Sequence, residues 1–173
     1  MSQNQKPFVA RKGQAEAVIY QRNNPLLKVL PVKYPGGYGK TDTTAMSYND
    51  KRSAGQVDRL LIVVANDVQL AQIRDEFAPA CRRIGFEIPG GVFPCDANHN
   101  ALGVSRKNKA EVYVTTIQRV SSTNRCKDFD PLRNLMEDGH RWMLAADEYH
   151  HYSTGNDWGI ALRDYTLHPF PFV

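Results

Sequence analysis

The sequence has few cysteines, and none of them are closely spaced. Cys81, Cys95 and Cys126 are an odd number and form no Cys-x-x-Cys pair, which excludes a dense disulfide framework. No apolar run is long enough to cross a bilayer, and the first residues lack the apolar core of a signal peptide. Internal repeats and low-complexity segments are also missing. From these absences we expect a cytoplasmic protein with no membrane partner.

Length and charge are those of an ordinary globular domain. The chain has 173 residues, enough for one domain with a sizeable core, and a formal net charge of +4. A mildly basic chain permits an acidic partner such as nucleic acid but does not require one. Composition therefore leaves the function open, and the motifs are more informative.

Two kinds of segment alternate along the chain: short continuous apolar runs, and segments in which apolar residues recur at helical spacing. This pattern predicts strands that alternate with helices. We expect helices at residues 13–23, 41–48, 66–85, 117–120, 131–137 and 160–165, and strands at residues 26–33, 59–65, 91–93, 111–116 and 141–146. The polar residues 49–58 predict a connecting loop. The continuous apolar run at residues 59–65 suits a strand that is covered on both faces. The sequence therefore predicts an α/β fold with a mainly parallel sheet flanked by helices.

One glycine-rich segment carries the strongest functional signal. It reads Tyr34-Pro35-Gly36-Gly37-Tyr38-Gly39-Lys40-Thr41 and directly precedes a predicted helix. In P-loop proteins such a segment turns tightly, points backbone N–H groups at one anion and adds the positive end of a helix dipole. Lys40 would reach the β- and γ-phosphates, and the Thr41 hydroxyl would hold Mg²⁺. Tyr34 departs from the general pattern, which has glycine six positions before the lysine.

The residues predicted to contact the nucleotide in and after this segment are Gly36, Gly37, Tyr38, Gly39, Lys40, Thr41 and Thr43. The alternative interpretation is an ordinary glycine turn between two elements. A true P-loop also needs an acidic Mg²⁺ partner farther along the chain.

Two carboxylates follow the predicted strand at residues 141–146. Asp147 is placed to bind Mg²⁺ directly or through water, and Glu148 to deprotonate a water that attacks the γ-phosphate. Ligands of parallel α/β sheets bind outside the carboxyl ends of the strands, and the glycine segment and both carboxylates follow such ends. The alternative is an acidic pair that caps the following turn.

Together, the glycine segment and Asp147-Glu148-Tyr149-His150 resemble motifs I and II of superfamily 2 helicases and translocases, the DEAD/DEAH-type proteins with an Asp-Glu-x-His signature. The resemblance implies a three-layer, RecA-like P-loop fold that binds ATP and Mg²⁺. It also implies catalytic roles for Lys40, Asp147 and Glu148, and a role for His150 in linking the nucleotide site to the nucleic-acid path. It covers residues 8–173 and is nearest to the DNA-acting branch that includes restriction-enzyme translocation subunits.

Weaker elements are similar to the same family. Arg11-x-x-Gln14 resembles its Q-type element, in which glutamine reads the adenine edge, and an amide offers the donor and the acceptor that suit this edge. Residues 65–72 resemble motif Ia, and residues 114–118 a later Thr-Thr-x-Gln element that contacts a single strand. The residues assigned in this way to nucleic acid are Asn66, Gln69, Thr115, Thr116 and Gln118. For any one of them a helix cap or a strand end is an equal alternative.

The matching motifs end before the family's motif III. We therefore expect residues 13–173 to be an incomplete first RecA-like domain that follows a flexible lead-in at residues 1–12. A second RecA-like domain or a partner subunit would supply the arginine finger, which contributes about 10³–10⁵ in rate in related phosphoryl transfer. The chain alone is expected to bind ATP better than it hydrolyses ATP.

Three functions are compatible with these motifs. The first is the ATP-binding N-terminal domain of a superfamily 2 helicase or translocase that acts on nucleic acid, DNA in preference to RNA. The second is a catalytically weak nucleotide-binding fragment or split subunit that acts through a partner chain. The third is a P-loop ATPase or kinase unrelated to nucleic acid.

Overall fold

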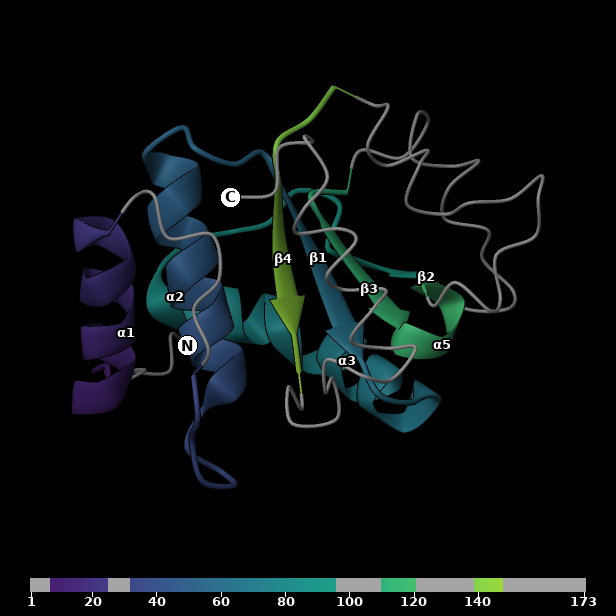
Figure 1. Cartoon of the computed structure of the whole chain (residues 1–173), viewed down its shortest axis with the longest axis horizontal. Coiled ribbons are helices and arrows are strands. Elements are labelled where there is room, and N and C mark those ends of the chain that lie inside the picture. Colours follow the sequence, from purple (N-terminus) through teal and green to yellow (C-terminus); the bar gives the residue numbers. More distant parts are fainter. Residues whose placement is uncertain (1–6, 25–31, 96–109, 121–138, 148–173) are drawn as a thin grey trace, which may run out of the picture.

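The computed structural model describes residues 7–24, 32–95, 110–120 and 139–147. Figure 1 shows the elements, which in chain order are α1 (Lys12–Asn23), α2 (Lys40–Ser53), β1 (Arg59–Val64), α3 (Asp67–Ile84), β2 (Val92–Cys95), β3 (Val112–Thr116), α5 (Ile117–Val120) and β4 (Trp142–Ala146). Each of these elements was expected from the sequence, with bounds that differ by at most two residues, except that α2 ends five residues later than expected. No described helix has the length and apolar character that a membrane span needs.

The strands form one parallel sheet. Its order is β2-β3-β1-β4, with β1 paired on one side to β3 and on the other to β4. The register places Ile62 of β1 opposite Val114 of β3 and Ala145 of β4. Because all strands run in the same direction (Figure 1), their carboxyl ends meet at one edge. The predicted α/β class, a parallel sheet flanked by helices, is confirmed.

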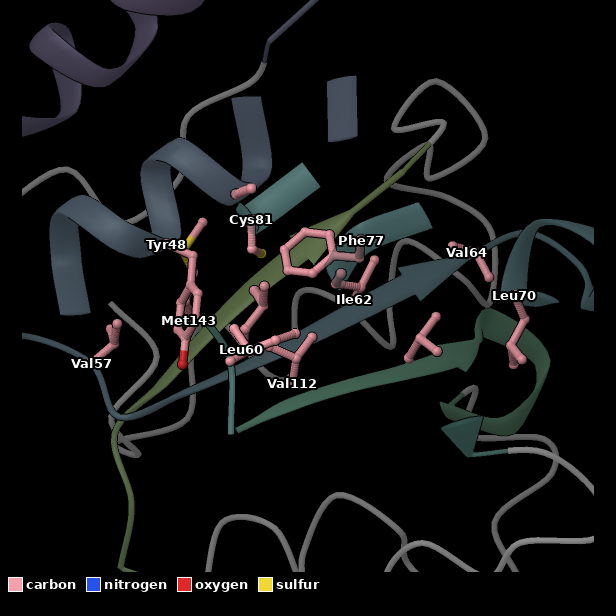
Figure 2. Close-up of a cluster of buried hydrophobic side chains, with 13 residues drawn as sticks. Tyr48, Val57, Leu60, Ile62, Val64, Leu70, Phe77, Cys81, Val112 and Met143 are labelled. Carbon is pink, nitrogen blue, oxygen red and sulfur yellow. The ribbon is translucent and has the colours of Figure 1, made fainter. Parts of the chain in front are cut away.

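The main core lies between the sheet and the helices α2 and α3. Leu60 and Ile62 of β1 join a buried cluster with Tyr48 of α2 and Phe77 of α3, as Figure 2 shows. The side chains that alternate with them in β1 are also buried, including Leu61 on the opposite face. The strand is thus covered on both faces, as its continuous apolar run predicted.

Helix α3 has the two ends that its sequence predicts. At its start, the side chain of Asn66 accepts a hydrogen bond from the N–H of Gln69 (3.0 Å), which is a typical N-cap. At its end, the N–H of Gly85 is bonded to the carbonyls of Cys81 and Arg82, which closes the last turn. Both caps are made by residues that are neighbours in the sequence, so the positions of the two helix ends could be predicted without knowledge of the fold.

The predicted loop at residues 49–58 is wrong in its first half, because α2 continues to Ser53. Tyr48 is fully buried and its hydroxyl donates to the carbonyl of Asp58 (3.2 Å). Lys51, one turn later, is also buried. Packing of this last turn against the core therefore extends the helix through a polar stretch, and only a short connection precedes β1.

Three expected elements cannot be compared with the structure. The helices expected at residues 131–137 and 160–165 lie outside the described residues. So does the strand expected at residues 26–33, except for residues 32 and 33, which have no regular structure.

Candidate functional site

The glycine segment forms a tight loop that leads directly into α2. Gly39 is the N-cap residue and has a left-handed backbone conformation (φ 89°, ψ 46°), which glycine adopts without strain. Its carbonyl accepts hydrogen bonds from the N–H of Thr43 (3.0 Å) and from the Thr43 hydroxyl (3.2 Å). The backbone N–H groups of Thr41 and Asp42 belong to the first turn, which has no intrahelical acceptors for them. The end of the helix therefore has the features of an anion site.

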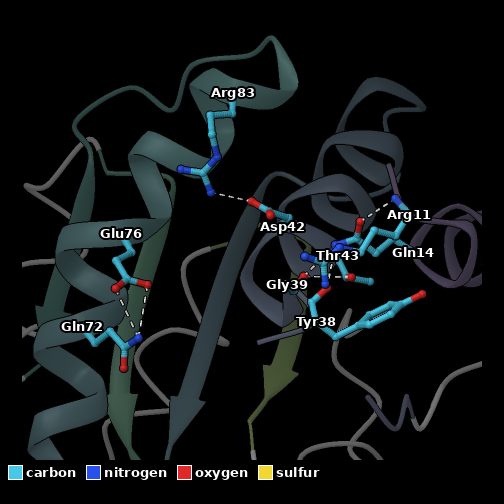
Figure 3. A network of polar contacts seen from close by, with 9 residues as sticks. All are labelled: Arg11, Gln14, Tyr38, Gly39, Asp42, Thr43, Gln72, Glu76 and Arg83. Carbon is cyan, nitrogen blue, oxygen red and sulfur yellow. Dashed lines mark hydrogen bonds and ion pairs between the residues drawn. The ribbon is translucent and has the colours of Figure 1, made fainter. Parts of the chain in front are cut away.

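Helix α1 holds this loop in place through side chains at its start. The Arg11 guanidinium donates to the carbonyl of Gly37 (3.1 Å), and Gln14 Nε2 donates to the carbonyl of Gly39 (3.0 Å). Gln14 Oε1 accepts from the N–H of Arg11 (2.8 Å), so the amide joins the two elements (Figure 3). Gln14 is only 2% exposed. The conformation of the loop thus depends on the docking of α1.

Two tyrosines complete the contact between the loop and α1. The Tyr34 hydroxyl donates to the carbonyl of Gly13 (2.7 Å), and the rings of Tyr34 and Tyr38 lie 4.7 Å apart. The Arg11 guanidinium lies 5.0 Å from the centre of the Tyr38 ring, a cation–π distance. Burial is the largest cause that raises the pKa of Tyr34, so its hydroxyl stays a proton donor. Tyr34, the departure from the general motif, therefore has a structural role that the sequence did not predict.

The carboxylate expected to face the loop does so. Asp147 follows β4, and its N–H donates to the carbonyl of Val63 in β1 (2.9 Å), which extends the strand pairing by one residue. Its Oδ1 lies 3.8 Å from Nζ of Lys40, the first residue of α2. Both side chains are partly exposed, Lys40 by 42% and Asp147 by 28%. The ammonium predicted to bind phosphate and the carboxylate predicted to bind Mg²⁺ thus meet at the carboxyl edge of the sheet.

A second group of predicted residues lies at the same edge, where β1 and β3 end. The side chain of Gln69 accepts from the N–H of Ala65 (2.9 Å), and Gln118 Nε2 donates to the carbonyl of Ala65 (2.8 Å). Ala65 therefore joins the start of α3 to the start of α5. Asn66 and Gln118 are exposed, whereas Thr115 and Thr116 are buried.

The sequence matches the model of a protein family. The family model described as ResIII, "Type III restriction enzyme, res subunit", matches residues 8–167. The chain belongs to this family. ResIII domains are superfamily 2 helicase-like ATPase domains, so the match agrees with the loop, the helix and the carboxylate found here. No curated protein matches the chain significantly.

The residues predicted to contact a nucleotide differ in how exposed their side chains are in this ResIII domain. Lys40, Thr41 and Asp147 are partly exposed at the site, and Gly36 and Gly37 are exposed. In contrast, the Thr43 hydroxyl donates to the carbonyl of Gly39, and the Thr43 side chain is buried. Gln14, predicted to read adenine, accepts from the Arg11 N–H through Oε1, and its Nε2 donates to the carbonyls of Tyr38 and Gly39.

Two predicted catalytic residues, Glu148 and His150, lie outside the described residues. The site also contains residues that sequence reasoning left out of the predicted set. Arg11 and Tyr34 each form a hydrogen bond between the glycine segment and the start of α1. In the sequence, the only indication of this role was that they lie close to the predicted site residues Gln14 and Gly36. In the described part of the site, the loop N–H groups and Lys40 are the candidates for binding a phosphate. Thr41 and Asp147 are the candidates for binding a hard cation, since hydroxyl and carboxylate oxygens are the ligands that Mg²⁺ prefers.

Proposed function

We propose that this ResIII chain is the ATP-binding N-terminal domain of a superfamily 2 helicase or translocase of the Asp-Glu-x-His type. Joined to a second RecA-like domain or a partner subunit, it couples ATP hydrolysis to movement on nucleic acid, with DNA preferred to RNA. The observation that carries the proposal is the 3.8 Å contact between Lys40 and Asp147. Two motifs that are far apart in the sequence meet there, next to a glycine loop that leads into α2.

Each residue of the site has a distinct task in this proposal. The loop amides and Lys40 hold the phosphates, since both bring positive charge to the start of α2. Thr41 and Asp147 are the protein ligands of Mg²⁺, which retains waters for its other positions and neutralises charge that develops on the phosphates. Glu148 is the base for the attacking water, and His150 connects the site to the nucleic-acid path. The role of Glu148 follows from its position directly after the strand end that carries Asp147, and the role of His150 follows from the sequence resemblance.

Nucleic acid is proposed to bind along the edge where β1 and β3 end. Asn66 and Gln118 are exposed there and can contact a strand directly. Gln69 accepts a hydrogen bond from Ala65 and so joins the start of α3 to the end of β1. Thr115 and Thr116 are buried at the end of β3 and contribute to its position rather than to direct contacts. Backbone N–H groups and amide side chains are suited to phosphate contacts, which position a strand without selecting a sequence.

The substitution Lys40→Ala tests the nucleotide site. It should abolish binding of Mg–ATP, measured by titration calorimetry, because the ammonium is the only side-chain cation assigned to the phosphates. The matched control is Lys33→Ala, which removes the same charge from an exposed position before the loop. Equal ATP affinities for the two variants would contradict the proposal.

Nucleic acid should raise the rate of ATP hydrolysis when the chain is assayed with its second domain or partner. Single-stranded DNA, single-stranded RNA and no nucleic acid are compared at low salt, because phosphate contacts weaken as salt rises. Turnover indifferent to both polymers would indicate a P-loop ATPase unrelated to nucleic acid. Binding of ATP without turnover would indicate a nucleotide-binding subunit that acts through another chain.

A further inference from the structure

The first turn of α2 carries a carboxylate beside the phosphate-binding loop. Asp42 lies in this turn, and its Oδ2 is 3.2 Å from the position that a Cβ on Gly39 would occupy. An acidic side chain stabilises a helix N-terminus through the helix dipole, but the same end attracts phosphate groups. Asp42 therefore places negative charge next to the point where a triphosphate is proposed to bind.

A cation from another helix neutralises this carboxylate. Arg83 lies in the last turn of α3, and its Nη2 is 2.7 Å from Asp42 Oδ1 (Figure 3). The carboxylate is the more buried partner, with its side chain 20% exposed against 51% for that of Arg83. Asp42 thus has one of its two oxygens fixed towards α3. The adjacent Arg82 is exposed, and its side chain makes no hydrogen bond or ion pair with the described part of the chain.

We propose that Arg83 is a positioning residue for the nucleotide site, where it neutralises Asp42 and keeps its carboxylate from opposing the phosphates. The proposal rests on the function proposed above and adds to it a residue outside the sequence motifs. The competing explanation is an ion pair that only helps α3 to pack on α2. Half-exposed ion pairs contribute little to stability. The two explanations therefore differ mainly in what they predict for phosphate affinity.

The substitution Arg83→Gln should weaken Mg–ATP binding about five-fold, the order of magnitude expected for one uncompensated charge close to the phosphates at a partly screened site. Mg–ADP should be affected less, because it carries less negative charge. The effect should also shrink at high salt. Affinities are measured by titration calorimetry with the whole chain, with circular dichroism and a thermal melt to verify the fold of each variant.

Three further variants make the test specific. Arg82→Gln removes an equal charge from the same helical turn and should leave the ATP affinity close to that of the unmodified chain. Arg83→Lys keeps the charge and should retain most of the affinity. Asp42→Asn combined with Arg83→Gln removes the cause of the repulsion, so affinity should return. An ion pair that only helps α3 to pack on α2 would instead change the melting temperature of these variants and leave the ATP affinity of each folded variant unchanged.

The outcomes separate the two proposals. If the unmodified chain binds Mg–ATP but Arg83→Gln behaves like Arg82→Gln, the positioning role of Arg83 is wrong and the proposed function stands. The same conclusion follows if the double variant stays as weak as Arg83→Gln. If the unmodified chain binds no nucleotide, the proposed function fails and the role of Arg83 fails with it.

Discussion

Gly39 is the residue on which the geometry of the loop most directly depends. Its φ of +89° is one that other residues adopt only at a cost, and a Cβ there would lie 2.6 Å from Gln14 Nε2. Because the Gln14 amide is buried and bonded at both ends, it has little room to withdraw. Strain and overlap therefore act together at a single position.

The substitution Gly39→Ala should destabilise the chain by more than about 1–2 kcal/mol, the cost of a left-handed conformation alone, because the overlap with Gln14 adds to it. Urea unfolding measures the change. Gly55→Ala is the control, since Gly55 also has a positive φ (66°) but a Cβ would meet nothing within 4 Å. Equal losses for the two variants would show that contact with Gln14 contributes nothing.

Single residues also show where sequence reasoning stopped. The glycine pattern and the rule on carboxyl ends of parallel strands were sufficient to place Lys40 beside Asp147. The resemblance to the Q-type element assigned Gln14 to adenine, which stays a prediction, while the described bonds of its amide go to Arg11 and to the loop carbonyls. These bonds arise from the docking of α1, and a contact between distant segments leaves no local pattern in the sequence.

At the scale of the elements, the ends set by local bonds were predicted and those set by packing were not. Helix α3 begins and ends at caps made by its own neighbours. Helix α2 continues to Ser53 because Tyr48 and Lys51 are buried by the fold. The order of the strands was not predicted either, because the hydrogen bonds of a parallel sheet join segments that are far apart in the chain.

An ion pair joins the connection before β1 to the start of β4 at the edge opposite the candidate site. The side chain and the N–H of Arg141 donate to the carboxylate of Asp58 at 2.8–3.1 Å. The Arg141 guanidinium also donates to the carbonyl of Gly55. Hydrogen bonds from Arg141 are the largest cause that lowers the pKa of Asp58 to about 2.

This pair should make stability depend on pH in the acid range. The pKa of Asp58 is lower in the folded chain than the roughly 3.9 of an unfolded aspartate. The contribution is therefore fully present above about pH 4 and is lost as pH falls through about 2. Asp58→Asn should be less stable than the unmodified chain at pH 6, and the difference should shrink towards pH 2. It should be small throughout, since both side chains are more than one third exposed.

Urea unfolding of both proteins across this pH range measures their free energies of unfolding. Subtracting one free energy from the other cancels the contributions of the other groups that titrate. A difference that stays constant from pH 6 to pH 2 would contradict the assignment of the low pKa to Asp58.

At the scale of the whole molecule, the candidate site joins parts of the chain that belong to different layers. Arg11 and Gln14 come from α1, Lys40 from α2, and Asp147 from the end of β4. A ligand that contacts the loop and Asp147 therefore stabilises the folded chain as a unit rather than one helix of it.

Mg–ATP should consequently raise the free energy of unfolding by about 2.7 kcal/mol at a concentration one hundred times its dissociation constant. A thermal melt with and without nucleotide measures this shift. Lys40→Ala should show none, although its own melting temperature should be close to that of the unmodified chain because Lys40 is 42% exposed. A shift of equal size in that variant would indicate that the nucleotide binds elsewhere.

The position of Asp147 also has a consequence for synthesis on the ribosome. Its place beside Lys40 depends on the pairing of β4 with β1, which the hydrogen bond to Val63 continues. A nascent polypeptide that already contains the glycine segment but has not yet released β4 lacks this carboxylate. The proposed nucleotide site therefore becomes complete only after β4 has left the ribosome and paired with β1.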